Sequence, residues 1–200
     1  RVEAIEALTL PTCRKEMHQR LGKLRYYRRF VRNYGDIEEP LRVKLKAESA
    51  WNDRDAEGNV VYTQREVDAF NTLRNALKTA PILCHPDWNK PFELHTDASS
   101  IGLGATLLQV IDGKEHVTAY ASRTLTKTEV KYSTWELEAL AVIWAVKLWN
   151  VYLQCGKFTV YTDSKAAIHM LNLKSETSSG RLMRWALILQ DYEMELKHRE

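Results

Sequence analysis

Apolar and polar residues follow two patterns along the chain: helical spacing in the first part and strand-like alternation later. The clearest helical row consists of Val67, Phe70, Leu73 and Leu77, which share one face of a helix. Further along the chain, three alternating β-rich runs follow one another at 92–97, 105–110 and 117–122. The pattern predicts a helical N-terminal part followed by a three-stranded meander.

A helix and further strands are predicted after the meander. Ser133 and Glu136 have capping-box spacing and predict the start of a helix that extends to about Trp149. A strand at 158–162 comes next, and this strand–helix–strand unit requires a crossover, which favours parallel pairing. Two more helices and a final strand are predicted at 164–173, 180–190 and 192–198. Residues 91–200 are therefore predicted to form an α/β domain.

Capping and helix-breaking residues predict short helices in the N-terminal part. Thr12 is a candidate N-cap, Gly22 a candidate helix end, and Pro40 is expected near the start of a further helix. Thr63 and Glu66 repeat the capping-box spacing and predict the start of the amphipathic helix described above. The sequence thus predicts a small helical unit ahead of the α/β domain.

Composition places the chain among ordinary globular proteins. Its 200 residues are 44% hydrophobic and 28% charged, which suffices to bury a core and excludes a disordered or fibrous protein. The longest apolar run, 139–146, is far shorter than the roughly 20 residues of a membrane helix, so we expect no membrane span. Cys13, Cys84 and Cys155 lack paired spacing, which argues against a disulfide framework or a zinc site.

Positive charge is concentrated near the N-terminus. The formal net charge is +3, yet residues 1–50 hold 12 Lys and Arg against 7 Asp and Glu. Residues 14–32 combine many cations with a single acid and interleaved aromatic residues. Two interpretations are open: a surface for the phosphates and bases of nucleic acid, or a solvated helix face whose aromatic residues turn inward. On the first interpretation, the residues assigned to nucleic-acid binding are Arg25, Tyr26, Tyr27, Arg28, Arg29 and Arg32.

Two similar phrases each place an aspartate at the end of a predicted strand. They are His-Thr-Asp-Ala-Ser, which contains Asp97, and Tyr-Thr-Asp-Ser-Lys, which contains Asp163. A single aspartate in such a position is ordinarily a cap or a solvated surface residue. Because the phrase occurs twice, a shared functional role is also indicated.

A third carboxylate is predicted on the helix that follows the meander. Glu136 is explained by its capping position, whereas Glu138 shares a helix face with small residues that allow close packing against a sheet. A carboxylate on a packed face is costly unless a charge or a metal compensates it. Asp97, Glu138 and Asp163 would form an oxygen-only cluster, which is typical of Mg²⁺ or Mn²⁺ and not of zinc. Composition and periodicity alone do not show whether the three meet in space.

Five longer phrases, taken in order, give the chain a family resemblance. They are LGKLRYYRRFVRNYGDIEEPL at 21–41, FNTLRNALKTAPILCHPDWNKPFELHTDASSIGLGATLLQ at 70–109, YASRTLTKTEVKYSTWELEALAVIWAVKLWNVYL at 120–153, GKFTVYTDSKA at 156–166 and RLMRWALILQDYEMELKHRE at 181–200. Over its whole length the chain resembles the Pol polyprotein of gypsy-type LTR retrotransposons, from the end of the reverse transcriptase through the ribonuclease H domain. The resemblance implies a ribonuclease H-like α/β fold, with a mixed five-stranded sheet whose neighbouring first and fourth strands bring Asp97 and Asp163 together.

The resemblance also implies an organisation along the chain. Residues 1–48 correspond to a helical thumb-like segment of the reverse transcriptase, 49–90 to a connecting segment, and 91–200 to a C-terminally truncated ribonuclease H-like domain. The polymerase palm would lie upstream in the parent polyprotein, with an integrase as a candidate downstream. The family's fourth acidic residue would lie beyond residue 200, so the fragment is expected to have an incomplete site. The resemblance would place the parent in intracellular particles or the nucleus.

The activity implied by the resemblance is endonucleolytic hydrolysis of the RNA strand of an RNA–DNA hybrid. Asp97, Glu138 and Asp163 would hold two Mg²⁺ or Mn²⁺ ions, with Asp97 shared between them. The basic, aromatic run would bind template and primer, while RNA-directed DNA synthesis would belong to the parent polyprotein. A second hypothesis comes from a different class: a non-catalytic module that binds nucleic acid, which a missing fourth acid would favour.

Overall fold

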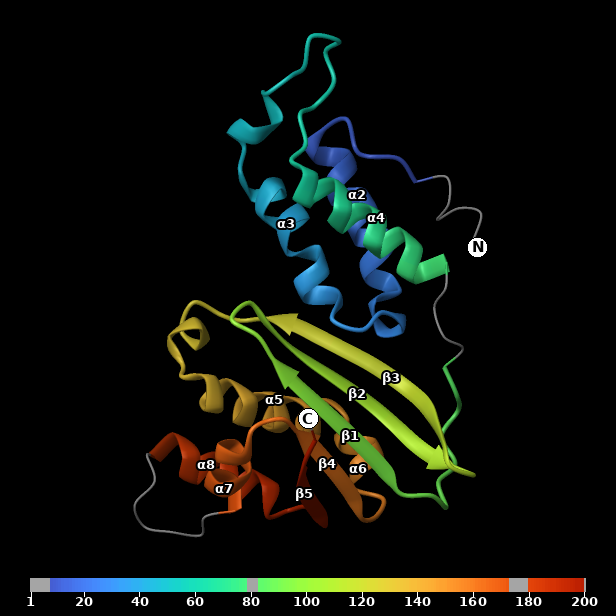
Figure 1. Cartoon of the computed structure of the whole chain (residues 1–200), viewed down its shortest axis with the longest axis vertical. Helices are drawn as coiled ribbons and strands as arrows, with labels where there is room; N and C mark the ends of the chain where they lie inside the picture. The colour runs from blue at the N-terminus through green and yellow to red at the C-terminus, as the bar shows by residue number, and fades with distance from the viewer. Residues whose placement is uncertain (1–7, 79–82, 173–179, 200) are drawn as a thin grey trace.

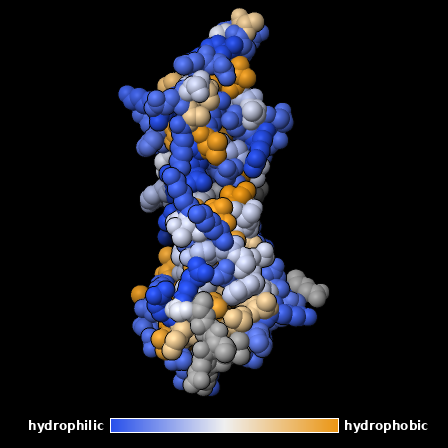
Figure 2. All heavy atoms as spheres, turned by 90° about the vertical axis from the view of Figure 1, so that its left-hand side faces the viewer, coloured by the Kyte–Doolittle hydropathy of each residue, from blue (hydrophilic) through white to orange (hydrophobic). Residues whose placement is uncertain are grey.

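A computed structural model describes residues 8–78, 83–172 and 180–199 of the chain, which form two parts (Figure 1). A helical unit, blue to green in the figure, stands on one side of a sheet that is covered by further helices. The space-filling view shows polar and apolar residues mixed over both parts, which meet at a narrower middle (Figure 2). Among the described residues, none of the helices combines the length and the apolar character that a membrane span requires.

In the described residues, the helical unit contains three α-helices and two short 3-10 helices. α2 (Arg14–Tyr26) is followed by η1 (Arg28–Phe30), α3 (Tyr34–Lys46) by η2 (Ser49–Trp51), and α4 (Gln64–Lys78) comes last. The buried apolar residues of these elements and their connections form one core: Met17, Leu21, Leu24, Val31, Tyr34, Leu41, Trp51, Val60, Ala69, Phe70, Leu73 and Leu77.

This core extends across the predicted boundary at residue 48. Leu41 lies before the boundary and Phe70 and Leu73 lie after it, and all three are buried in the same cluster. The described residues of the predicted thumb-like and connecting segments therefore pack as one unit. Their assignment to parts of a reverse transcriptase stays a prediction.

Two predicted helix boundaries in this unit are wrong, and packing explains both. Gly22 does not end a helix, because α2 continues past it and buries Leu24 in the core. Pro40 does not lie near a helix start but inside α3, where its missing N–H removes one backbone hydrogen bond. Burial of Tyr34 and Leu41 on either side of it holds the helix together in spite of this loss.

The two predicted N-caps of the unit have different outcomes. α4 starts as predicted, because Thr63 donates its backbone N–H to Glu66 Oε2 at 2.9 Å and Glu66 returns its own N–H to Thr63 Oγ1 at 3.3 Å. Thr12 is not the N-cap of α2. Cys13 occupies that position, while the backbone N–H of Thr12 is bound by Glu16 Oε2 at 2.9 Å.

Within the described residues five strands form one mixed sheet, as the resemblance implies. β1 (Phe92–Ala98), β2 (Gly102–Ile111) and β3 (Lys114–Thr124) make the predicted antiparallel meander. β4 (Phe158–Thr162) pairs in parallel with β1, and β5 (Met194–His198) pairs in parallel with β4. The strand order is β3-β2-β1-β4-β5, so the first and fourth strands are neighbours.

The β2–β3 hairpin turns on a two-residue connection. Asp112 and Gly113 both have left-handed backbone angles, with φ of 53° and 74°. Two such residues in succession form the tight turn whose twist matches that of antiparallel strands, and Asp-Gly is a favoured pair for it. The hairpin register is therefore fixed at this end of the sheet.

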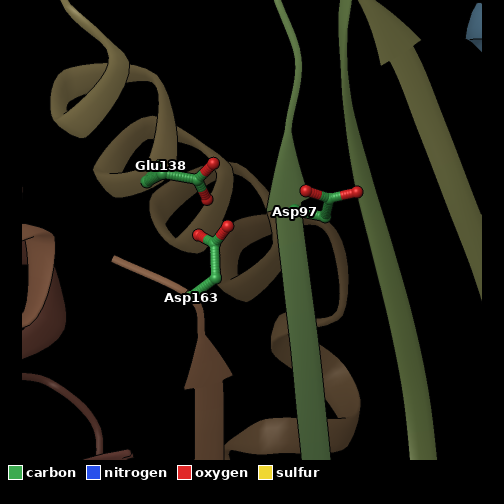
Figure 3. Close-up of side chains that lie close together, drawn as sticks. All are labelled: Asp97, Glu138 and Asp163. Atoms are coloured by element: carbon green, nitrogen blue, oxygen red, sulfur yellow. The ribbon is translucent and has the colours of Figure 1, made fainter. Parts of the chain in front are cut away.

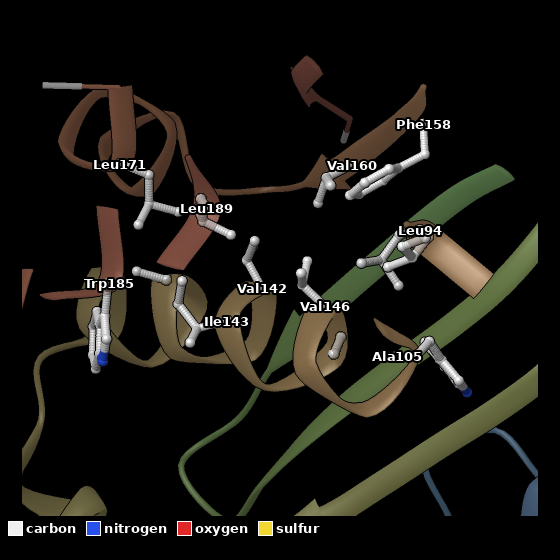
Figure 4. Close-up of a cluster of buried hydrophobic side chains, with 14 of the residues drawn as sticks. Leu94, Ala105, Val142, Ile143, Val146, Phe158, Val160, Leu171, Trp185 and Leu189 are labelled. Carbon is white, nitrogen blue, oxygen red and sulfur yellow. The ribbon is translucent and has the colours of Figure 1, made fainter. Parts of the chain in front are cut away.

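Among the described residues, four helices contribute to the core on one face of the sheet. They are α5 (Thr134–Leu148), α6 (Asn150–Leu153), α7 (Lys165–Asn172) and α8 (Gly180–Leu189). Figure 4 shows Val142 and Val146 of α5 directed at Leu94 of β1 and Val160 of β4 within the main core. The small residue Ala145 is fully buried beside them, which allows α5 to lie close to the strands.

β2 begins earlier than the sequence predicts. The strand starts at Gly102, and its register pairs Gly104 with Asp97, whereas the predicted run begins at residue 105. Glycine is unfavourable inside strands, so a sequence rule places Gly102 and Gly104 outside one. Their lack of side chains leaves room for the Arg123 backbone of β3 and for Asp36 and Asn33 of the helical unit.

The helical unit is joined to the sheet by polar contacts with β3. The backbone N–H of Gly35 at the start of α3 donates to Ser122 Oγ at 2.8 Å. Arg42, further along α3, donates to Thr124 Oγ1 at 3.1 Å. These contacts fix the start of α3 above the end of the sheet at which β1 and β4 terminate.

Candidate active site

Asp97, Glu138 and Asp163 meet at one end of the sheet (Figure 3). Asp97 lies near the end of β1 and Asp163 directly follows β4, and because these strands are parallel neighbours their carboxyl ends lie together. Glu138 extends toward them from the first turns of α5. Each of the three offers a carboxylate oxygen, and these oxygens all lie within 4.8 Å of one another. The cluster that the sequence could only suggest is present in the fold.

The three carboxylates differ in their surroundings. Asp97 and Asp163 are exposed, whereas Glu138 is only 2% exposed. Glu138 Oε1 accepts a hydrogen bond from the backbone N–H of Ala98 at 3.2 Å, but among the described residues its Oε2 is buried without a hydrogen-bond partner. Burial, together with the negative charges of Asp163 and Asp97, raises the pKa of Glu138 to about 8.

Glu136, two residues earlier on the same helix, has a structural role. It forms the predicted capping box with Ser133, whose backbone N–H it accepts at 2.9 Å. Its other oxygen forms a salt bridge with Arg181 of α8. With both oxygens engaged in this way, Glu136 is not free to join the cluster, and the distinction drawn from spacing between Glu136 and Glu138 agrees with the structure.

The site suits a hard divalent cation. Its ligand atoms are carboxylate oxygens alone, which favours ions such as Mg²⁺ or Mn²⁺ over zinc. A bound cation would give the buried Glu138 oxygen a partner, and it would also reduce the repulsion among the three neighbouring carboxylates. The residues present therefore fit a metal centre, which would be built on Asp97, Glu138 and Asp163.

A polar cleft opens beside the carboxylates. It has a volume of about 500 Å³ and lies along the strands, where Asp97 and Asp163 line it together with His95 and Tyr161. His95 and Tyr161 lie two residues before the aspartates on β1 and β4, so the alternation of a strand directs them to the same face. Arg32, from the helical unit, also lines the cleft and brings a cation close to the acidic cluster.

The residues predicted to bind nucleic acid have several different environments. Tyr26 is 77% exposed, and Arg28 and Arg29 are also exposed on the helical unit. Arg25 instead forms a salt bridge with Glu38, whose side chain is only 7% exposed, through Nε at 2.6 Å. Tyr27 packs partly against the helical core.

Of these residues, Arg32 alone lines the cleft in the part of the chain that the structure describes. Tyr26, Arg28 and Arg29 are placed where they could meet a ligand, whereas Arg25 also stabilises the helical unit. A nucleic-acid role for the set therefore stays a prediction.

Sequence reasoning missed two residues beside the cluster, Asp36 and Ser99. Ser99 follows Asp97 in the turn after β1, and Ser99 Oγ lies 3.2 Å from Asp36 Oδ2 of the helical unit. No local pattern marks Asp36, because its neighbour is 63 residues away in the chain. The pair is visible only once the helical unit is placed on the sheet.

A five-stranded mixed sheet with helices on one face and an acidic cluster where β1 and β4 end defines a ribonuclease H-like domain. Residues 87–192 match the family described as the RNase H-like domain found in reverse transcriptase. The chain belongs to this family.

Curated relatives place the domain in retrotransposon polyproteins. The chain is 35% identical over 199 residues to the retrovirus-related Pol polyprotein from transposon opus of Drosophila melanogaster, covering 98% of the chain and 20% of that protein. It is 33% identical over 192 residues to the transposon Tf2-3 polyprotein of Schizosaccharomyces pombe, covering 94% of the chain and 14% of that polyprotein. The chain thus spans a fifth or less of these relatives, and the resemblance to retrotransposon Pol polyproteins is confirmed.

Solved structures show the same fold over the whole chain. The foamy viral protease-reverse transcriptase in complex with dsDNA has a TM-score of 0.72 at 22% identity, covering 100% of this chain and 40% of the viral one. The same viral protein in complex with an RNA/DNA hybrid also has a TM-score of 0.72, at 21% identity, covering 100% of this chain and 26% of that one.

Proposed function

We propose that this chain is the part of a retrotransposon reverse transcriptase that cleaves the RNA strand of RNA–DNA hybrids. The cluster of Asp97, Glu138 and Asp163 carries the proposal, because three carboxylates at this spacing suit the binding of divalent ions for phosphodiester hydrolysis. Membership of the ribonuclease H-like family of reverse transcriptases supports the same reaction. RNA-directed DNA synthesis is assigned to the parent polyprotein.

Each carboxylate has a proposed role. Asp97 and Asp163 are exposed to the cleft, so they would hold the ions on the side that a substrate can reach. Glu138 would complete the ligand set from the buried side, with the Ala98 N–H fixing its orientation. Two bound Mg²⁺ or Mn²⁺ ions would supply an activated water and stabilise the leaving oxygen. A fourth carboxylate from a continuation of the chain would tighten metal binding.

Hybrid binding is assigned to the exposed cations of the helical unit. Tyr26, Arg28 and Arg29 offer stacking and phosphate contacts, and Arg32 lies at the cleft itself. This assignment agrees with residues 1–48 acting as a thumb-like segment and 49–90 as a connecting segment. Preference for RNA would come from contacts with the 2′-hydroxyl and from the groove shape of the hybrid.

The proposal is tested with Asp97→Asn in the full-length parent protein and a hybrid labelled on its RNA strand. We expect the variant to bind the hybrid like the wild type and to lose cleavage by at least about a hundredfold, because a ligand of the metals is missing. Asp112→Asn is the matched control: it lies at the β2–β3 turn, where asparagine also suits the backbone. Undiminished cleavage by Asp97→Asn would reject the assignment. Hybrid binding by the wild type without any cleavage would favour a non-catalytic binding module.

A further inference from the structure

The start of α3 lies unusually close to the first residues of β2. A Cβ atom added to Gly102 would lie 2.5 Å from Asp36 Oδ1 and 2.8 Å from the Arg123 carbonyl oxygen. A Cβ atom on Gly104 would lie 2.8 Å from Asn33 Oδ1. All three distances are too short for a real side chain. A side chain at Gly102 would meet the β3 backbone, and at either glycine the Asp36 or Asn33 side chain of the helical unit would have to move.

Ser99 connects this contact to the turn that follows β1. Its hydroxyl oxygen accepts the backbone N–H groups of Ile101 at 3.2 Å and Gly102 at 3.0 Å. The hydroxyl proton is directed toward Asp36 Oδ2 at 3.2 Å or the Gly102 carbonyl oxygen at 3.3 Å. A carboxylate is the stronger acceptor of the two. Asp36 therefore orients the hydroxyl so that both of its lone pairs face the two amides.

The same turn begins two residues after the candidate metal ligand. Asp97 is opposite Gly104 in the β1–β2 register, and the next residue, Ala98, donates its N–H to Glu138. Ala98, directly after Asp97, is thus held by Glu138, and the turn that follows is held by Ser99 and Asp36. A carboxylate from the helical unit therefore contacts the turn that begins two residues after Asp97.

We infer that Asp36 is a positioning residue, which acts through Ser99 to hold Asp97 in the geometry that the metal site requires. The inference rests on the proposed function, because Asp97 is treated as a metal ligand. It makes the helical unit part of the hydrolytic site, and the same docking places Arg32 at the cleft. Partners of metal ligands typically change metal affinity or activity by about 10- to 100-fold when removed.

Retaining Asp36 here is electrostatically unfavourable. Half-buried, it lies close enough to Asp97 for the two negative charges to repel, and burial with this repulsion raises its pKa. Its place in the first turn of α3, where the helix dipole favours a carboxylate, offsets part of this cost. The negative charge of Asp36 also makes it a strong acceptor for the Ser99 hydroxyl.

The test compares Asp36→Ala, Ser99→Ala and their double variant in the whole chain. The first readout, Mn²⁺ affinity by electron paramagnetic resonance, should weaken by about tenfold in each single variant and no further in the double variant. The second readout, hydrogen exchange of the Ile101 and Gly102 amides without metal, should accelerate in all three. Asp36→Asn retains an acceptor oxygen and should restore part of the wild-type Mn²⁺ affinity and part of the wild-type protection of the two amides.

Controls separate positioning from folding and from the proposed function. Asp68→Asn, an exposed aspartate on α4, should match the wild type.

Wild-type Mn²⁺ affinity and amide exchange in Asp36→Ala would overturn the inference, even if the parent cleaves hybrids. A wild-type chain that binds no Mn²⁺ at the carboxylates would overturn it as well. If the parent protein does not cleave hybrids but the effects on Mn²⁺ affinity and amide exchange are observed, the positioning role of Asp36 is still supported.

Discussion

Replacing Glu138 with glutamine should change how the stability of the protein depends on pH. Burial, Asp163 and Asp97 raise the pKa of Glu138 from 4.5 to about 8, so the folded protein holds this proton more tightly than the unfolded chain. The free energy of unfolding of the wild type therefore falls as the pH rises from about 4.5 to about 8. Glutamine has nearly the same shape and does not titrate, so the free energy of unfolding of Glu138→Gln should not fall in this way.

The size of the effect follows from the two pKa values. With a pKa of about 8 in place of 4.5, the wild type loses free energy of unfolding relative to low pH. The loss is about 1 kcal/mol at pH 5, about 3 kcal/mol at pH 7 and about 5 kcal/mol above pH 8. The repulsion is shared with Asp97 and Asp163, which relieve part of it by their own protonation or movement. We therefore expect the stability advantage of Glu138→Gln to grow by about 2 kcal/mol between pH 5 and pH 8.

The assay is urea unfolding of both proteins at several pH values in the presence of a chelator. Glu57→Gln, an exposed glutamate in the helical unit, is the matched control and should show no growing advantage. Added Mg²⁺ should stabilise the wild type more than Glu138→Gln, because an ion that binds only the folded state raises stability by mass action. A stability difference between wild type and Glu138→Gln that does not change with pH would refute the account of the buried carboxylate.

Two further predictions concern the parts of the fold on either side of the site. Arg25→Ala leaves the buried Glu38 carboxylate without its cation and should lower the free energy of unfolding by about 1–3 kcal/mol, measured by urea unfolding. A loss below a few tenths of a kcal/mol would contradict the structural role of this ion pair. Gly113→Ala places a side chain at a φ of 74° and should cost about 1–2 kcal/mol, seen as a lower thermal midpoint, and an unchanged midpoint would count against the tight hairpin turn.

Much of the α/β domain could be predicted because its signals are local. Alternation marked the strands, and the Ser133–Glu136 capping box marked the start of α5. Glu138 could be distinguished from Glu136 because a capping position explains the one and nothing local explains the other. That the three carboxylates meet came from the family resemblance, since the pairing of β1 with β4 is set by a long crossover and not by any short pattern.

The parts that were missed depend on contacts between distant segments. Pro40 inside α3 breaks a local rule that tertiary burial overrides. Gly102 and Gly104 indicate a turn by composition, yet they lie in β2, where side chains at these positions would meet the β3 backbone, Asp36 and Asn33. Asp36 beside Ser99 is a contact of the same kind, and it bears most directly on the site.

The proposed function requires that Asp97, Glu138 and Asp163 form a hydrolytic metal centre. Its most direct test is the product pattern of an end-labelled RNA–DNA hybrid incubated with the full-length parent protein and Mg²⁺. We predict internal cuts in the RNA strand that disappear with chelator and with Asp97→Asn, while the DNA strand stays intact. Internal RNA cuts that persist at the same rate in Asp97→Asn would contradict the claim.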